Sequence, residues 1–183
     1  MDALTLLLTR RSCGTLEAPA PAGEALDIIL RAAFRVPDFQ RLRPYEFILC
    51  EGDGLDRLGA IFERAAIASG QPDDVTARTP RMPHRAPLVV VVVAKHRPSA
   101  VVTPFEQHLT AGCAVMAMQM AAQAQGFGGI WKSGWLMTDP TVHRELGLAA
   151  EDRIVGFLYL GTPSRAPSPA PEVTERERYV RKL

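Results

Sequence analysis

The chain has 183 residues, of which 47% are hydrophobic and 22% are charged, and its formal net charge is +1 at neutral pH. This composition is typical of a globular protein, and a chain of this length is most economically one domain, so we assign residues 1–183 to a single domain. The nearly balanced charge offers no electrostatic basis for binding nucleic acid or an anionic membrane, and we expect neither partner.

The cysteines and the N-terminal residues indicate which cellular compartment to expect for the protein. Cys13, Cys50 and Cys113 are an odd number at unrelated spacings, which fits neither a disulfide framework nor a zinc site. We expect buried free thiols in a reducing cytoplasm. The apolar run from Leu4 to Leu8 is followed by arginines rather than by a small-residue cleavage site, so we do not interpret it as a signal peptide.

The first third of the chain contains two predicted helices. Asp2 can cap a first helix that carries three leucines on one face. The alternating Ala and Pro residues from Ala18 to Ala22 predict an extended connector. A second helix is expected from about Glu24 to Arg35, because an apolar stripe runs along it and Pro37 follows.

The middle of the chain alternates between strand and helix signals. Tyr45–Cys50 is aromatic and aliphatic, which favours a strand, and Gly52 turns the chain into a third helix. Ser69–Pro87 is polar and rich in Pro and Arg, which predicts a mobile loop. Leu88–Ala94 contains five consecutive valines and predicts a strand buried on both faces. The residues of the third helix that should face inward are Leu55, Leu58, Phe62 and Ala65.

The stretch from Gln107 to Trp131 has no formally charged side chain. Its Ala and Met content favours a helix, and a helix that is apolar all round must be enclosed. Its glutamines argue against lipid, so we expect a central core helix shared with a second subunit. Leu109, Cys113, Met116 and Met120 fall three or four residues apart, as one face of such a helix requires.

The last third supplies two more strands and a tail. Gly126 should end the central helix before a short strand over Gly128–Trp131, and Asp139-Pro140 should start a short helix closed by Gly147. Ile154–Leu160 is the last predicted core strand. About four strands and five helices without strict alternation predict an α+β layered domain. The tail over residues 163–183 is rich in Pro and charge, and we expect it to be disordered or packed on a partner subunit.

Few residues suggest chemistry by themselves. The four histidines are scattered, and no metal-ligand spacing, Gly-x-Ser-x-Gly motif or P-loop occurs. Arg10, Arg11 and Ser12 suit a phosphate, because guanidinium groups bind its oxygens bidentately. The alternative is that these cations, and Arg35 after the second helix, only interact with helix dipoles. A tryptophan with an apolar flank, such as Trp131, is more often a core aromatic than a cofactor contact.

Four segments resemble the FMN-dependent nitroreductase family, specifically its short single-domain branch, whose members are described as NAD(P)H nitroreductases. They are Thr9–Ser12, Arg43–Phe47, Cys113–Gly134 and Ile154–Pro163. The resemblance implies an antiparallel sheet wrapped by helices and a domain-sharing homodimer with FMN at the interface.

The resemblance also implies roles for individual residues. Arg10, Arg11 and Ser12 would hold the FMN phosphate and ribityl chain, and the turn at Trp131, Lys132 and Ser133 would line the isoalloxazine edge. Arg35 and Phe39 would reach the same flavin from the second subunit. Family members carry His at position 39 and Arg at position 132, so this chain loses one hydrogen-bonding group and one guanidinium fork.

The implied activity is the transfer of electrons from NAD(P)H through FMN to a nitroaromatic or quinone-like acceptor. A backbone N–H of the Trp131 turn is the expected donor to flavin N5, and no side chain is assigned as a catalytic acid or base. Two alternatives stay open. One is a specialised flavin enzyme of the same fold, such as a dehalogenase or a flavin-fragmenting reductase. The other is a non-catalytic FMN-binding carrier or sensor dimer.

Overall fold

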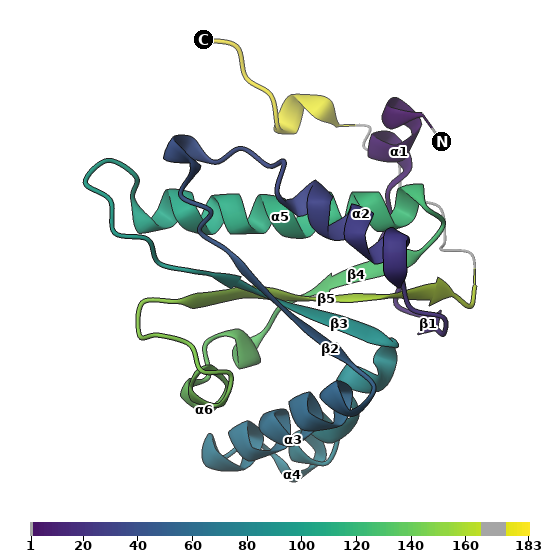
Figure 1. Cartoon of the computed structure of the whole chain (residues 1–183), viewed down its shortest axis with the longest axis vertical. Helices are drawn as coiled ribbons and strands as arrows, with labels where there is room; N and C mark the ends of the chain where they lie inside the picture. Colours follow the sequence, from purple (N-terminus) through teal and green to yellow (C-terminus); the bar gives the residue numbers. More distant parts are fainter. Residues whose placement is uncertain (1, 166–174) are drawn as a thin grey trace.

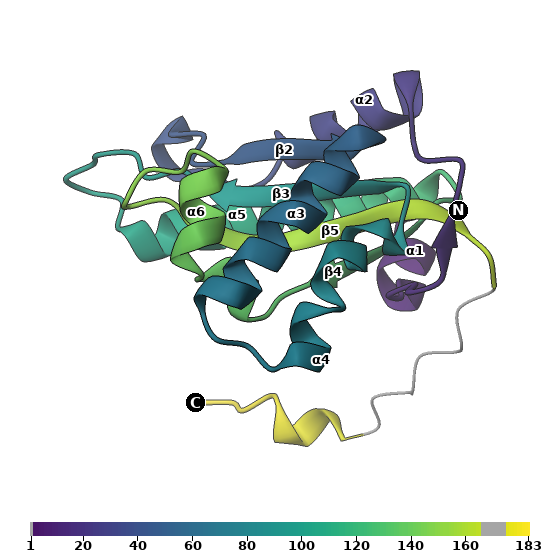
Figure 2. The same ribbon diagram turned by 90° about the horizontal axis from the view of Figure 1, so that it is seen from below.

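The computed structural model describes residues 2–165 and 175–183, and it consists of an antiparallel sheet with helices on both faces (Figures 1 and 2). The strands are β1 (Leu16–Glu17), β2 (Glu46–Glu51), β3 (Leu88–Ala94), β4 (Gly128–Lys132) and β5 (Arg153–Pro163). The helices are α1 (Ala3–Thr9), α2 (Gly23–Ala33), α3 (Asp53–Ala68), α4 (Asp73–Thr76), α5 (Pro104–Ala124) and α6 (Pro140–Glu145).

All strand pairs are antiparallel, in the order β1-β5-β3-β2, and β4 lies beside β5. The long strand β5 pairs with β4 over residues 157–161 and then with β1 over residues 162–163. This arrangement confirms the predicted α+β fold with an antiparallel sheet wrapped by helices. The N-terminal segment also reaches β4, because the Cys13 N–H donates to the Gly129 carbonyl at 2.9 Å.

The alternation of side chains along β3 builds the two halves of the core. Val89, Val91 and Val93 pack in the cluster that contains the buried residues of α3 and α6. Their neighbours on the opposite face pack against α2 and α5. Every residue of β3 is buried, as predicted for a strand with helices on both sides. Figure 1 shows the two helical layers above and below the sheet.

Local signals placed several helices correctly. The Asp2 carboxylate accepts hydrogen bonds from the N–H groups of Leu4 and Thr5, and the Asp139 carboxylate caps α6 in the same way. The predicted inward face of α3 is confirmed, since Leu55, Leu58, Phe62 and Ala65 are all buried.

The segment Ser69–Pro87 was predicted as a mobile loop, and this was wrong. It contains α4 and two short 3₁₀ turns, η2 (Thr79–Arg81) and η3 (Pro83–Arg85), which pack on α3. Thr79 is fully buried and its hydroxyl donates to the carbonyl of Thr76 at 2.8 Å. Proline is abundant here because 3₁₀ turns accept it at their start. Composition alone does not distinguish such turns from a loop.

Burial of α5 is one-sided in the single chain, whereas its lack of charge predicts a helix enclosed all round. Leu109 is 53% exposed and Met116 is 37% exposed in the single chain, and Cys113 is exposed rather than buried. The face turned to the sheet includes three alanines, which let the helix approach the strands closely. Its buried residues are Gln107, Ala111, Ala114, Val115, Met118, Gln119 and Ala122.

Three further expectations concern the ends of elements. The two-residue strand β1 was not predicted, and α2 ends at Ala33 rather than near Arg35. The predicted tail falls partly on residues 166–174, which lie outside the described residues. Residues 175–183 contain one 3₁₀ turn, Arg176–Arg178, and Tyr179 there is 78% exposed.

Within residues 2–165 and 175–183, no helix is long and apolar enough to cross a membrane. The same residues hold no group of three or more His, Cys, Asp or Glu side chains that could bind a metal ion.

The packing of η2 on α3 generates a stability prediction. A Cβ on Gly59 of α3 would lie 2.3 Å from the backbone oxygen of Pro80, so Gly59→Ala forces the two elements apart. We expect a loss of about 1–3 kcal/mol in the free energy of unfolding, measured by urea denaturation. Gly54→Ala in the same helix is the control, because its Cβ meets nothing closer than 3.7 Å. It should be neutral, or more stable by up to about 1 kcal/mol. Equal stability of the two variants would contradict the packing of η2 on α3.

Candidate functional site

One cavity brings several of the predicted site residues together. It has a volume of about 580 Å³ and lies between the end of α1, the exposed side of α5, the turn after β4, and β5. We call it the Arg10 cavity, and its lining residues are Arg10, Ser12, Met116, Gln119, Trp131, Ser133, Met137 and Val155.

The cationic end of the Arg10 cavity begins where α1 stops. Arg10 is the C-cap of α1, and its N–H donates to the carbonyl of Leu6 at 2.9 Å. Its side chain is half-buried and, among the described residues, forms no ion pair with a carboxylate. Ser12 is exposed beside it. A guanidinium and a hydroxyl on one wall can bind an anionic oxygen group.

A glutamine pair holds this N-terminal segment against α5. The Arg11 N–H donates to Gln123 Oε1 at 3.3 Å, and the Cys13 N–H donates to the Gly129 carbonyl at 2.9 Å. The same carbonyl accepts from Gln119 Nε2 at 2.9 Å, and Gln119 is 3% exposed. Arg10 and Ser12 therefore occupy fixed positions relative to β4, because the residues beside and between them are tied to it and to α5.

Close approach of β4 to its neighbours requires glycine. A Cβ on Gly128 would lie 2.6 Å from Leu16 and 3.1 Å from Cys13. A Cβ on Gly129 would lie 3.0 Å from Leu160 and 3.4 Å from Gln119. The glycines that follow α5 are thus explained by packing.

Trp131 is a fixed wall of the Arg10 cavity rather than a core aromatic, since it is 39% exposed. Its indole Nε1–H donates to the Val155 carbonyl at 3.1 Å. In the pairing of β3 with β5, Val92 faces Gly156 and Val93 faces Ile154, so Val155 is the extra residue of a β-bulge. Because of this bulge the Val155 carbonyl lies outside the regular β3–β5 pairing, and it accepts the indole N–H.

Gly156 and Gly112 make room for that indole. A Cβ on Gly156 would lie 2.0 Å from Trp131 Nε1, whereas a Cβ on Gly112 of α5 would lie 3.7 Å from the far edge of the ring. The first distance is impossible without displacing Trp131, and the second is an ordinary contact. Only glycine at position 156 therefore leaves room for the Trp131 indole where it lies.

Lys132 and Ser133 differ in the cavities that they line. Ser133 lines the Arg10 cavity and also a second cavity, whereas Lys132 lines only the second one, together with Phe157 and Tyr159. The reason is the alternation of side chains along β4, which turns Trp131 toward α5 and Lys132 toward α3. The backbone of Lys132 stays within the turn that borders the Arg10 cavity.

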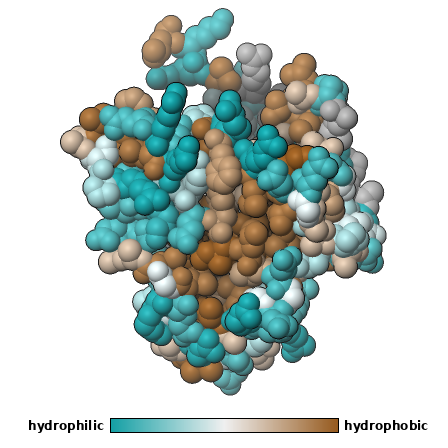
Figure 3. Space-filling view, viewed as in Figure 1, coloured by the Kyte–Doolittle hydropathy of each residue, from teal (hydrophilic) through white to brown (hydrophobic). Residues whose placement is uncertain are grey.

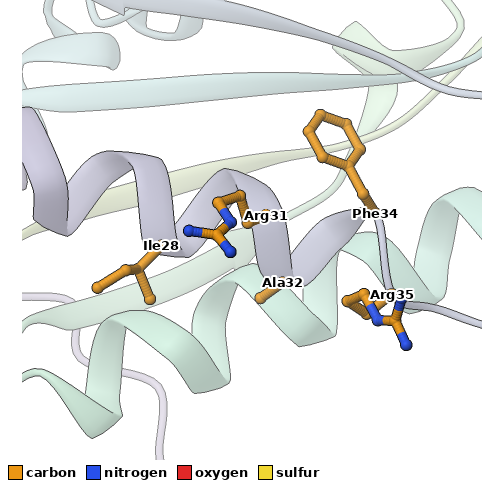
Figure 4. Close-up of a pocket in the computed structure, with 5 residues that line it drawn as sticks. All are labelled: Ile28, Arg31, Ala32, Phe34 and Arg35. Carbon is orange, nitrogen blue, oxygen red and sulfur yellow. The ribbon is translucent and has the colours of Figure 1, made fainter.

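Arg35 and Phe39 lie away from the Arg10 cavity within this chain. Arg35 lines an open hollow at the end of α2 with Ile28, Arg31, Ala32 and Phe34, and Figure 4 shows Phe34 and Arg35 leaving the helix end in different directions. Phe39 is 63% exposed.

The loop that carries Phe39 has an unusual backbone. Gln40, Arg41 and Arg43 have φ angles of 63°, 53° and 48°, a left-handed region that side chains disfavour. The Asp38 carboxylate compensates by accepting the N–H groups of Leu42 at 3.1 Å and Arg43 at 2.8 Å. The loop is thereby held in one conformation with Phe39 exposed.

Contacts along helix α5 give the distance between the Arg35 region and the Arg10 region within one chain. Thr110 Oγ1 donates to the carbonyl of Pro37 near Arg35, and Gln123 accepts from Arg11 at the other end of the helix. Positions 110 and 123 are about 20 Å apart at 1.5 Å per residue. An arginine side chain cannot span that distance, so Arg35 and Arg10 of one chain cannot hold the same small group.

Sequence reasoning missed five residues of this site: Met116, Gln119, Met137, Val155 and Gly156. Two of them had a usable signal. A glycine inside a strand pattern indicates a bulge or a close approach, which is the role of Gly156. A glutamine on a helix without charges must find a partner when buried, as Gln119 does.

The tryptophan contact can be tested through Gly156. We expect Gly156→Ala to displace the Trp131 indole and to lower the free energy of unfolding by about 1–3 kcal/mol. In a Trp135→Phe background, Trp131 is the single tryptophan, and its emission should shift to the red as it loses the Val155 carbonyl.

Gly112→Ala in the same background is the matched control and should leave the emission unchanged. Removing the indole as well, in Gly156→Ala/Trp131→Ala, should make the alanine at 156 tolerable. If Gly156→Ala leaves Trp131 emission and stability unchanged, the described packing is wrong.

Comparison with known proteins identifies relatives of this chain. The model of the Nitroreductase family matches residues 7–162. The chain is 50% identical over 181 residues to the Escherichia coli K12 protein named "Putative NAD(P)H nitroreductase YdjA", covering 95% of this chain and 99% of that protein.

Solved structures show the same fold. A nitroreductase-like family protein from Bacillus cereus superposes with a TM-score of 0.85 at 23% identity, covering 100% of this chain and 96% of the other. A structure from Desulfovibrio desulfuricans, described as a putative nitroreductase in complex with FMN, has a TM-score of 0.76 at 21% identity and covers 98% and 96%. The chain belongs to the nitroreductase family.

Proposed function

We propose that this chain is an FMN-dependent oxidoreductase that transfers electrons from NAD(P)H to a nitroaromatic or quinone-like acceptor. Membership of the nitroreductase family supports the proposal, as do the name of the E. coli relative and the FMN complex of the D. desulfuricans protein. Its three unpaired cysteines suit a reducing compartment, and we propose the cytoplasm.

The observation that carries the proposal is the Arg10 cavity. Its volume of about 580 Å³ lies within the ~300–1,000 Å³ typical of cofactor sites. Arg10 and Ser12 supply a phosphate-binding end, while Met116, Trp131 and Val155 supply apolar surface for a planar ring system. The residues present therefore fit FMN, with Arg11 next to its phosphate end.

The protein's part is to bind and orient the cofactor, which when bound supplies the redox chemistry. The Trp131–Ser133 turn borders the cavity, and its backbone N–H groups are our candidates for the hydrogen bond to flavin N5. Lys132 would contribute through its backbone there, because its side chain lines the other cavity. The residues that line the Arg10 cavity include no carboxylate and no imidazole, so we assign no catalytic acid or base.

We propose a homodimer that shares its sites. Exposed apolar side chains on α5 and α2 favour a partner, among them Phe105 at 68%, Leu109 at 53% and Phe34 at 55% exposure. Figure 3 shows apolar surface gathered across the middle of one face of the single chain. The whole chain would form one domain in this dimer, and the exposed Tyr179 of the tail is available to pack on the partner.

The length of α5 explains why the sites need both subunits. A two-fold axis that passes near the middle of α5 reverses the helix in the partner. The end that carries Arg35 and Phe39 then approaches the partner's end that carries Arg10. The Arg35 and Arg10 regions, which are about 20 Å apart within one chain, thus come close together when they belong to two different chains.

The redox function can be tested by the colour of the protein. Protein purified with FMN should be yellow, release FMN on heating, and lose its absorbance near 450 nm when NADH or NADPH is added without oxygen. A nitroaromatic or quinone should then restore the absorbance. Protein that stays colourless with excess FMN would refute the proposal, and yellow protein that neither nucleotide bleaches would indicate a carrier or sensor.

The shared site can be tested by mixing two variants. Arg10→Glu and Arg35→Glu each place a negative charge beside an anionic cofactor, so each homodimer should lose FMN. When the two are unfolded and refolded together, random pairing makes about half of the dimers mixed, and each mixed dimer has one intact site.

Roughly a quarter of all sites should therefore recover FMN and activity. If both arginines served a site within one chain, every site would keep a defect and mixing would restore nothing. Size-exclusion chromatography must first show that both variants are folded dimers, and zero recovery from such dimers would rule out the shared site.

A further inference from the structure

A second, more enclosed cavity lies on the α3 side of the sheet. Its volume is about 180 Å³, and we call it the Tyr159 cavity. It is formed by α3 and η3 on one side, by β5 below, and by the chain that follows β4, including η4 (Trp135–Met137). The lining residues are Phe62, Met82, Arg85, Lys132, Ser133, Gly134, Trp135, Leu136, Phe157 and Tyr159.

The inner end of the Tyr159 cavity is aromatic. Phe62 is 1% exposed and Phe157 is 4% exposed, and their rings meet edge to face with centroids 5.3 Å apart. A dry cavity of roughly 150 Å³ is large enough to bind benzene. The Tyr159 cavity can therefore hold one six-membered ring with a small substituent, but not a dinucleotide.

Tyr159 brings a polar group into this apolar space. Its side chain is 5% exposed, and its hydroxyl forms no hydrogen bond with any described residue. Burial raises the pKa of Tyr159 to about 12, although the Arg85 guanidinium opposes the shift. The phenol is therefore protonated at neutral pH, and its O–H is available to donate to a ligand.

Two cations lie at the same cavity. Arg85 is exposed and Lys132 is half-buried, and neither pairs with a carboxylate among the described residues. In the same segment, by contrast, Arg78 pairs with Asp74 at 3.1 Å. No Asp or Glu lines the Tyr159 cavity, so its charge is uncompensated where it opens to solvent. A ligand that fits would place an aromatic ring inward and an anionic group outward.

The cavity adjoins the candidate flavin site. Ser133 lines both the Arg10 cavity and the Tyr159 cavity, and the Trp131–Ser133 turn separates them. Met82 and Arg85 come from the segment that was predicted as a loop, and that segment supplies one wall of the cavity.

We propose that the Tyr159 cavity binds a small aromatic carboxylate, with the ring against Phe62 and Phe157 and the carboxylate between Arg85, Lys132 and the Tyr159 hydroxyl. The site is separate from the candidate cofactor site, since the Trp131–Ser133 turn lies between the two cavities.

The binding claim is tested with benzoate and the neutral benzamide. Titration calorimetry on the FMN-loaded protein should show benzoate binding more tightly than benzamide. Arg85→Met should weaken benzoate binding by about 3–10-fold, a modest effect because the guanidinium is partly screened by water. Tyr159→Phe should weaken it by a similar factor through loss of one hydrogen bond. Arg81→Met is the control in the same segment, because Arg81 is exposed and lines no part of this cavity, and it should bind benzoate as the wild type does.

Benzoate affinity that is unaffected by both Arg85→Met and Tyr159→Phe would place the acid elsewhere and overturn the proposal, as would benzamide binding as tightly as benzoate. The titrations decide the claim whether or not the protein turns over, because they measure binding alone.

Discussion

The carbonyl group of Gly129 is the contact on which the candidate site depends. It accepts the Cys13 N–H and the Gln119 side-chain N–H, each at 2.9 Å, and so joins the N-terminal segment, α5 and β4 at one atom. Leaving any of these buried groups without a partner would cost roughly 1–3 kcal/mol. The positions of Arg10 and Ser12 relative to the Trp131 turn follow from this junction, because both walls of the cavity are attached to it.

Much of the fold was predictable because local chemistry and tertiary packing agree. Asp2 and Asp139 are N-caps in the sequence and in the structure, and the valines of β3 lie in the middle of the sheet as an uninterrupted apolar strand requires. The grouping of Arg10, Ser12, Trp131 and Ser133 was also anticipated, but through resemblance to a family. The residues alone left a helix-dipole role and a core role open.

The remaining features depend on contacts between residues distant in sequence. The bulge at Val155 exists because β5 must pair with β3 and also offer a carbonyl to Trp131, and neither demand is visible in the segment itself. Burial of α5 also depends on such contacts. The absence of charge predicts a helix enclosed all round, whereas the sheet covers only the face that carries residues such as Ala114 and Met118, and Leu109 and Met116 remain on the surface of the single chain.

The glutamines of α5 show why the helix avoids charge without becoming simply apolar. Gln119 and Gln123 reach backbone groups of β4 and of the Arg11 segment, and Gln125 donates to the carbonyl of Ala25 at the start of α2. A lysine or glutamate at position 119, where the glutamine is 3% exposed, would carry a desolvation penalty of several kcal/mol, and a leucine at position 123 would remove the acceptor of the Arg11 N–H. An uncharged amide satisfies both limits. The same helix presents Met116 and Gln119 to the Arg10 cavity, so the residues that attach it to the sheet also shape one wall of the candidate cofactor site.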